Sequence, residues 1–239
     1  MALTILHTND FHGRLTQWMA EHILMEKRRC EPALYFDTGD CIKSGNLAIP
    51  LRQEPAWDLL HFAGCDASVL GNRETHVLQS AFQAKIAGHK QPMLCANLRL
   101  KSGKRPLAES LIFERAGLKI GVFGIMVPMV TDRMKTQAAS AYLWDPPLET
   151  ARRIVGALIG EVDLVIALTH IGHKKDLELA EFCPEIDVIL GGHSHTILEE
   201  PLKVNKTWIC QGGSHGRYIG RYEWENGVLS GGLLAMDRL

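Results

Sequence analysis

Five short polar clusters stand at the ends of apolar segments, and their side chains are of the types that bind divalent cations. The clusters are Asp10-Phe11-His12, Gly39-Asp40, Gly71-Asn72-Arg73-Glu74, Thr169-His170 and Gly191-Gly192-His193-Ser194-His195. Carboxylate, imidazole and amide groups without a thiolate are ligands of hard to borderline metals. In the Asp-x-His and His-x-His spacings, both side chains of an extended segment point to the same side. Each cluster alone is common, but the ordered set predicts a metal site.

The segments that precede these clusters are expected to be strands of an α/β protein. Expected strands are residues 3–7, 33–36, 67–70, 93–96, 119–123, 164–168, 188–190, 207–210, 218–224 and 228–236. Expected helices are residues 18–29, 55–63, 78–87, 147–159 and 175–182. Because ligands bind at the carboxyl ends of strands in open α/β sheets, the five clusters should meet on one rim.

Charge and composition limit the classes of function. The chain has 239 residues, with 26 Lys and Arg against 27 Asp and Glu, a net charge of −1 and 46% hydrophobic residues. This balance predicts a folded core and argues against binding of a nucleic-acid polymer. The longest apolar stretch, 121–130, is too short to span a bilayer, and the first residues carry no secretory signal. We therefore expect a cytoplasmic protein without a membrane partner, and six cysteines without a Cys-x-x-Cys pair agree with a reducing compartment.

The ordered clusters resemble the calcineurin-like metallophosphoesterase superfamily, whose pattern runs Asp-x-His, Gly-Asp-x-x-x-Gly, Gly-Asn-His-Glu, a further histidine and Gly-His-x-His. More narrowly, the segments ILHTNDFHG, FDTGD, VLGNRE, LCANL, VDLVIALTHIG, IDVILGGHSH and QGGSHGRYIGR resemble the catalytic N-terminal domain of the 5′-nucleotidase/UDP-sugar hydrolase/2′,3′-cyclic phosphodiesterase family. The resemblance covers nearly the whole chain and implies a four-layer α/β/β/α sandwich with two mixed β-sheets. We expect residues 1–239 to form a single metallophosphoesterase catalytic domain, without the C-terminal nucleotide-binding domain of the two-domain nucleotidases.

The resemblance also implies two metal sites that share a bridging aspartate, Asp40. The first site would use Asp10, His12, Asp40 and His195, and the second would use Asp40, Asn72, His170 and His193. Two divalent cations, two aspartates and a bridging hydroxide leave the pocket net positive, which suits a phosphate ester. The implied reaction is in-line attack on phosphorus by the metal-bridging hydroxide. The expected cofactors are two divalent ions (Mn, Fe, Zn, Co or Ni), among which the ligand types do not choose.

Arg73 departs from the family pattern, which has a histidine after the asparagine and, in nucleotidases, an aspartate where this chain has His76. Arginine binds phosphate oxygens and stabilises developing charge, but it does not release its proton at neutral pH. We expect catalytic roles for Asn72, Arg73 and His76. In one hypothesis Arg73 holds the phosphate and His76 protonates the leaving group. In a second, protonation is missing and only good leaving groups react; in a third, His76 is an ordinary solvated or capping residue.

The sequence thus predicts a metal-dependent hydrolase of phosphate esters, either a 5′-nucleotidase-like phosphomonoesterase or a phosphodiesterase. Because of Arg73, two alternatives stay open. One is a hydrolase of a non-phosphate ester, and the other is a metal-binding scaffold that kept the fold without turnover. The expected partner is a small phosphorylated molecule, with a nucleotide as one candidate, and a homo-oligomer stays open.

Overall fold

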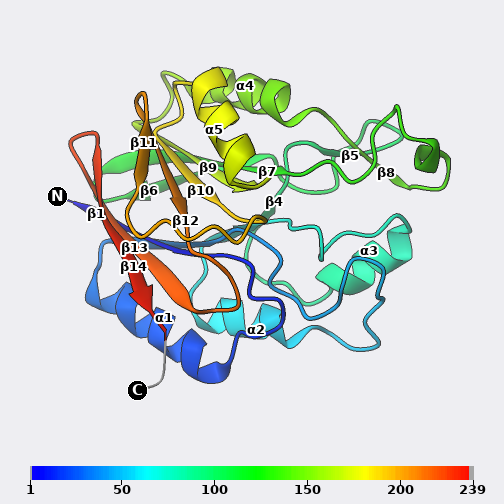
Figure 1. Ribbon diagram of the computed structural model, residues 1–239, viewed down its shortest axis with the longest axis horizontal. Coiled ribbons are helices and arrows are strands. Elements are labelled where there is room, and N and C mark those ends of the chain that lie inside the picture. Colours follow the sequence, from blue (N-terminus) through cyan, green and yellow to red (C-terminus); the bar gives the residue numbers. More distant parts are fainter. Residues whose placement is uncertain (1, 237–239) are drawn as a thin grey trace.

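The computed structural model describes residues 2–236 and contains two six-stranded β-sheets (Figure 1). The strands of the first sheet are β1 (Leu3–Thr8), β2 (Ala33–Asp37), β3 (Ala67–Val69), β4 (Met93–Leu94), β13 (Tyr218–Glu225) and β14 (Val228–Ala235). Those of the second are β6 (Ser110–Arg115), β7 (Leu118–Met126), β9 (Leu164–His170), β10 (Val188–Gly191), β11 (Leu202–Val204) and β12 (Thr207–Gln211). The short strands β5 (Leu98–Leu100) and β8 (Tyr142–Trp144) form a separate pair.

Both large sheets are mixed. The first has the order β14-β13-β1-β2-β3-β4, in which β1 to β4 are parallel and β13 runs antiparallel to both of its neighbours, β1 and β14. The second has the order β11-β12-β10-β9-β7-β6, in which β7, β9, β10 and β12 are parallel and the two edge strands are antiparallel. Parallel strands buried on both faces read as continuous apolar runs, which is the pattern of the sequence.

Helices cover the outer faces of the two sheets, so the molecule has four layers. The helices are α1 (Gln17–Arg29), α2 (Pro55–Phe62), α3 (Gln79–Ile86), α4 (Pro147–Leu158) and α5 (His173–Phe182), and a short 3₁₀ helix covers Lys135–Ala138. α1 and α2 lie on the first sheet, and α4 and α5 lie on the second (Figure 1). Between the sheets, Ile5 and Phe36 of the first pack with Val122 and Ile166 of the second. The predicted α/β/β/α sandwich is therefore confirmed.

Every expected helix and strand occurs, with ends that differ by at most three residues. Four further strands, β5, β6, β8 and β11, were not predicted from the sequence. β6 is half exposed and carries charges at its end, whereas β5, β8 and β11 have three residues each, too few to show a period. α5 begins two residues earlier than expected because Gly172, at a φ of 85°, directly precedes its first turn.

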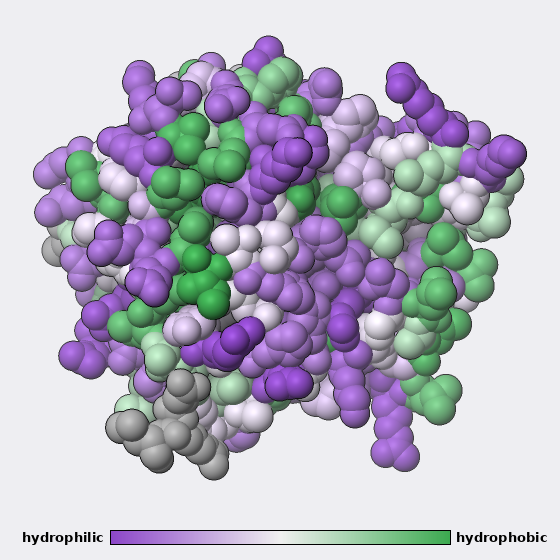
Figure 2. Space-filling view, viewed as in Figure 1, coloured by the Kyte–Doolittle hydropathy of each residue, from purple (hydrophilic) through white to green (hydrophobic). Residues whose placement is uncertain are grey.

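The carboxyl ends of β1, β2, β3, β9 and β10 lead into the five polar clusters. On the face shown in Figure 2, hydrophilic side chains gather in the middle, between the helical layers at top and bottom. Among the described residues, none of the helices combines the length and apolar character that crossing a bilayer requires.

Candidate metal centre

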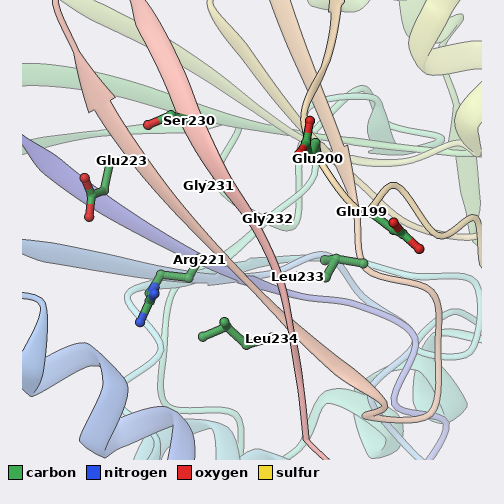
Figure 3. A pocket seen from close by; sticks show the side chains of 9 residues that line it. All are labelled: Glu199, Glu200, Arg221, Glu223, Ser230, Gly231, Gly232, Leu233 and Leu234. Carbon is green, nitrogen blue, oxygen red and sulfur yellow. The ribbon is translucent and has the colours of Figure 1, made fainter.

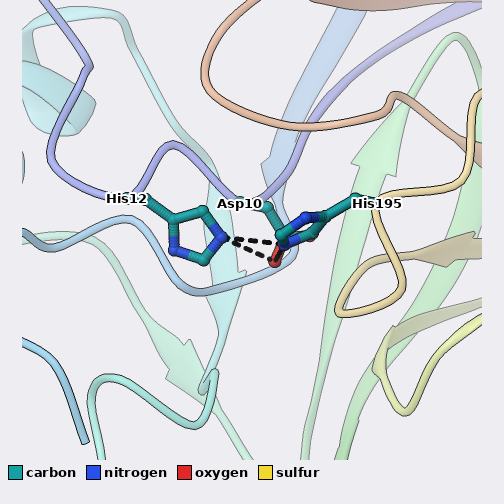
Figure 4. Close-up of side chains that lie close together, drawn as sticks. All are labelled: Asp10, His12 and His195. Atoms are coloured by element: carbon teal, nitrogen blue, oxygen red, sulfur yellow. Dashed lines mark hydrogen bonds and ion pairs between the residues drawn. The ribbon is translucent and has the colours of Figure 1, made fainter.

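Asp10, directly after β1, presents one carboxylate oxygen to two imidazoles (Figure 4). Its Oδ2 accepts hydrogen bonds from the His193 backbone N–H and from Asn9 Nδ2, both at 2.8 Å. Its buried Oδ1 has no hydrogen-bond partner within residues 2–236, although His195 Nε2 lies 3.3 Å away and His12 Nε2 lies 3.6 Å away. One carboxylate oxygen of Asp10 and one ring nitrogen each of His12 and His195, the atoms that could bind a metal, lie within 4.8 Å of one another. Leaving a buried carboxylate oxygen unpaired is costly, so this group fits a cation.

A second group of donors lies beside the first, and Asp40 faces both. Asp40 Oδ2 lies 3.8 Å from His12 Nδ1, and Asp40 Oδ1 lies 3.5 Å from His170 Nε2. Asn72 Oδ1 lies 3.1 Å from His170 Nε2 and 2.8 Å from His193 Nδ1. Donor atoms of Asp10, Asp40 and His170 also lie within 4.8 Å of one another. The structure thus brings together all seven predicted ligands.

The orientation of His170 is set by the backbone of the first sheet. Its Nδ1 lies 2.7 Å from the Thr38 carbonyl oxygen, which can only accept, so Nδ1 carries a proton. In the neutral ring, Nε2 then presents a lone pair toward Asp40 and Asn72. A carbonyl that holds the far nitrogen of a ligating histidine is the usual support of a metal ligand. These facing acceptor atoms fit a divalent cation.

Charge at the site favours the same conclusion. Burial lowers the pKa of His12 to about 4, so this ring is neutral at pH 7, the form that ligates metals. Burial also acts to lower the pKa of His170, but the Asp40 and Asp10 carboxylates outweigh it and the pKa is raised. Negative charge therefore concentrates where His170 meets the two aspartates, and a cation or a proton is stabilised there.

The backbone around the site is unusual. Positive φ angles between 52° and 76° occur at five of the seven candidate ligands: Asp10, His12, Asp40, His193 and His195. Residues with side chains rarely adopt this left-handed conformation, and such strain clusters at functional sites. Glu74 stabilises one of the turns, because its carboxylate accepts hydrogen bonds from the backbone N–H groups of Asp40, Gly71 and Ile42.

Known proteins are similar to this chain in sequence and in structure. No protein-family model matches the chain. It is 32% identical to the 5′-nucleotidase of Vibrio cholerae over 95% of this chain and 50% of that protein. It is 29% identical to the uncharacterized metallophosphoesterase YunD of Bacillus subtilis over 92% of this chain and 49% of that protein. The calcineurin-like phosphoesterase YfkN of Bacillus subtilis has a similar structure, with a TM-score of 0.79 and 20% identity over 98% of this chain and 90% of that one.

By sequence and fold, the chain is a relative of the metallophosphoesterases. The predicted resemblance is confirmed. The chain spans about half the length of the curated relatives that it matches.

Within this metallophosphoesterase fold, Arg73 lies at the margin of the donor groups. Its backbone N–H donates to Asp40 Oδ1 at 2.7 Å, and its Nη1 donates to the Lys43 carbonyl oxygen at 3.1 Å. Its Nε lies 4.0 Å from Asp40 Oδ2, and 29% of its side chain is exposed. The guanidinium is therefore both anchored to the site and open to a ligand.

His76 lies on the turn between Arg73 and α3. Its Nδ1 accepts a hydrogen bond from the Leu78 backbone N–H at 3.0 Å, a contact within the turn that precedes α3. The ring also lines a cavity of about 70 Å³ together with Asn46 and Trp144. The hypothesis of an ordinary structural residue has this turn contact in its favour, although α3 has no side-chain cap, and the proton-donor hypothesis stays a prediction.

His215 lies outside the predicted set, yet the fold brings it to the candidate metal centre. Its ring centroid lies 5.0 Å from that of His12 and 5.9 Å from that of His195. Its Nδ1 is 2.8 Å from the Ser214 hydroxyl, and its φ is 64°. The only local signal is the Gly-Ser-His-Gly sequence after β12, a turn motif by itself.

A separate open cavity of about 400 Å³ lies against β13 and β14 (Figure 3). It is lined on its polar side by Glu199, Glu200 and Glu223 with Arg221. None of the residues lining it is one of the seven candidate ligands. Its acidic side chains disfavour binding of a phosphate group, so this cavity is a poorer candidate for a phosphate-ester site than the group of candidate metal ligands.

Proposed function

We propose that the chain is a dinuclear metal-dependent hydrolase of phosphate esters, either a 5′-nucleotidase-like phosphomonoesterase or a phosphodiesterase. One observation carries the proposal: a buried carboxylate oxygen without a hydrogen-bond partner in the described part of the chain faces two imidazole rings. Asp10 Oδ1 is unpaired within residues 2–236 and faces His12 and His195. Acceptors arranged in this way favour cations, and imidazole with carboxylate favours divalent transition metals.

The seven ligands divide into two sets that share Asp40. The first set is Asp10, His12, Asp40 and His195, and the second is Asp40, Asn72, His170 and His193. Asp40 supports the sharing because its two oxygens face His12 and His170 respectively. A pair of divalent cations supplies Lewis-acid stabilisation of phosphoryl charge and a water nucleophile at neutral pH.

Arg73 binds the phosphoryl group in this proposal. A guanidinium offers several fixed N–H donors that match phosphate oxygens and stabilises the charge that develops on them. The contacts of Arg73 with Asp40 and Lys43 hold it at the site, so it is ordered before the substrate binds. Since arginine keeps its proton, Arg73 cannot also protonate the leaving group.

His76 is the residue proposed to protonate the leaving group. Because its Nδ1 accepts from the Leu78 N–H, the neutral ring carries its proton on Nε2. To protonate a leaving group the ring must first become the imidazolium, in which Nδ1 also carries a proton and gives up the Leu78 contact; Nε2 then donates its proton to the leaving-group oxygen and the neutral ring regains the contact. The substrate class is a small phosphate ester, and the name of the Vibrio cholerae relative favours a nucleotide.

Replacing the shared ligand tests the proposal. In Asp40→Asn we expect the protein to bind fewer than two Mn²⁺ ions and to lose at least about 100-fold in kcat/KM, because both ligand sets lose a charge. Metal content is measured by equilibrium dialysis, and activity is measured on a panel of nucleotides, alkyl and aryl phosphates, phosphodiesters and thiosulfate esters. Asp58→Asn, on the exposed face of α2, is the matched control.

The outcomes separate the candidate functions. Full occupancy with full activity in Asp40→Asn would contradict the ligand assignment. Metal-loaded protein that turns over no ester of the panel would favour a metal-binding scaffold. Turnover of the thiosulfate ester alone would favour the alternative that the chain hydrolyses a non-phosphate ester.

A further inference from the structure

The amide of Asn72 must point in one direction to serve a cation. Its Oδ1 faces the candidate metal ligands, 3.1 Å from His170 Nε2 and 2.8 Å from His193 Nδ1. An amide rotated by half a turn would present its NH₂ there, and two N–H donors repel a cation. Something must therefore favour one orientation over the other.

Asn46 favours the orientation in which the Asn72 amide oxygen faces His170 and His193. Asn72 Nδ2 donates a hydrogen bond of 3.0 Å to Asn46 Oδ1. With the Asn72 NH₂ held there, its oxygen is left to face His170 and His193. Asn46 belongs to the loop after β2, in the same loop system as Asp40, so the contact joins two of the polar clusters.

A buried ammonium places this loop. Lys85 of α3 is fully buried, and its Nζ donates to the carbonyl oxygens of Gly45 at 2.7 Å, Asn46 at 3.1 Å and Arg73 at 2.6 Å. An ammonium has three donors, and three carbonyls use all of them. The backbone of Asn46 and the backbone of Arg73, which follows Asn72, are thereby fixed to one point. The Trp57 indole N–H holds the Lys85 carbonyl in turn, at 2.9 Å.

We propose that Asn46 is a positioning residue for the metal centre: its side-chain oxygen, placed by the buried Lys85, holds the Asn72 amide oxygen toward His170 and His193. This inference rests on the proposed dinuclear function. It assigns to Asn46 no contact with the substrate. Partners that orient a metal ligand in this way are typically worth 10- to 100-fold in metal affinity.

Mn²⁺ binding tests the inference without reference to turnover. In Asn46→Leu we expect the Mn²⁺ ion of the second ligand set, which contains Asn72, to bind about 10-fold more weakly by calorimetry. The affinity of the ion of the first set should change by less than about threefold. Asn46→Leu should fold, because Asn46 is exposed and Lys85 contacts only its backbone. The low-temperature EPR signal of a coupled Mn²⁺ pair should require correspondingly more metal to appear.

Three further variants make the readout specific. Asn46→Asp keeps an acceptor for Asn72 Nδ2 and should restore the second affinity. Leu47→Asp adds the same charge at the neighbouring, 87% exposed position without the acceptor and should not mimic the rescue in the Asn46→Leu background. Gln17→Leu removes an exposed amide of α1 that bonds Glu21, and it should leave both affinities unchanged.

The two hypotheses fail differently. If the natural chain binds fewer than two Mn²⁺ ions, the dinuclear function and the inference both fall. If it binds two and Asn46→Leu binds both with unchanged affinity, only the role of Asn46 is overturned. Equal weakening in Asn46→Leu and Gln17→Leu would overturn it as well.

Discussion

At the residue scale, the two oxygens of Asp10 take different parts. Oδ2 is satisfied by the Asn9 amide and the His193 backbone, so it fixes the loop after β10 against the loop after β1. Oδ1 keeps its full acceptor capacity and faces the rings of His12 and His195. One carboxylate therefore ties two loops together and offers its other oxygen to the proposed cation, which would offset the cost of burying the charge.

The dual position of His76 leads to a prediction about leaving groups. His76→Asn removes the imidazole but keeps an acceptor for the Leu78 N–H, so the turn before α3 is preserved. We expect kcat/KM on an alkyl phosphate to fall about 100-fold, the lower part of the range for general acids, because an alkoxide needs a proton to leave. On an aryl phosphate we expect less than about a threefold change, measured by steady-state kinetics.

His61→Asn, at an exposed position of α2, is the control and should change neither rate. Equal losses on alkyl and aryl substrates would remove His76 as the proton donor. Unchanged rates on both would leave His76 with its contact in the turn alone.

At the element scale, the site depends on strands that end abruptly and turn without spare room. After β3, a Cβ atom on Gly71 would lie 2.2 Å from the Asp40 backbone nitrogen and 2.5 Å from Asp40 Oδ1. The glycine lets the turn between β3 and α3 approach the turn after β2 this closely. This approach lets the Arg73 backbone N–H reach Asp40 Oδ1.

We therefore expect Gly71→Ala to lower the free energy of unfolding by about 1–3 kcal/mol and to weaken Mn²⁺ binding, because the backbone of Asp40 must move. Gly156→Ala is the matched control: it lies in α4, where a Cβ would meet nothing within 4 Å. That change should raise stability by about 0.5–1 kcal/mol and leave metal binding intact. Urea unfolding and calorimetry measure both quantities, and a neutral Gly71→Ala would contradict the tight packing.

At the scale of the whole molecule, the candidate ligands link the two sheets. Asp10, His12 and Asp40 follow strands of the first sheet, whereas His170, His193 and His195 follow strands of the second. The chain distance between His12 and His195 is 183 residues, yet their Nε2 atoms lie 2.8 Å apart. Cations held here would bind the folded state and have no comparable site in the unfolded chain.

Mn²⁺ should therefore stabilise the protein. At about 100 times the dissociation constant, one site contributes about 2.7 kcal/mol, which corresponds to a rise of about 5–10 °C in Tm. Differential scanning calorimetry with added Mn²⁺ or EDTA measures the shift. Asp40→Asn should lose most of it and Asp58→Asn should keep it; an unchanged Tm in the natural chain would contradict a metal centre.

Much of the fold was predictable because apolar strand runs and amphipathic helices are local patterns. The strands that precede the clusters, β1, β2, β3, β9 and β10, are all of this kind. β6 and β11 were not predicted because these edge strands are half exposed or more and lack a continuous apolar run. The short pair β5 and β8 joins residues more than forty positions apart, so its cause is tertiary.

The types of candidate ligand, their order and their places at strand ends could be predicted from the chain alone, since they follow from residue chemistry and short-range periodicity. Which candidate ligands share a group, that Asp10 has one oxygen without a partner within residues 2–236, and that His76 bonds the Leu78 N–H became known from the fold. It also brought His215, Asn46 and Lys85 to the centre. The physical reason is that contacts between distant loops depend on how the two sheets pack, which no local pattern encodes.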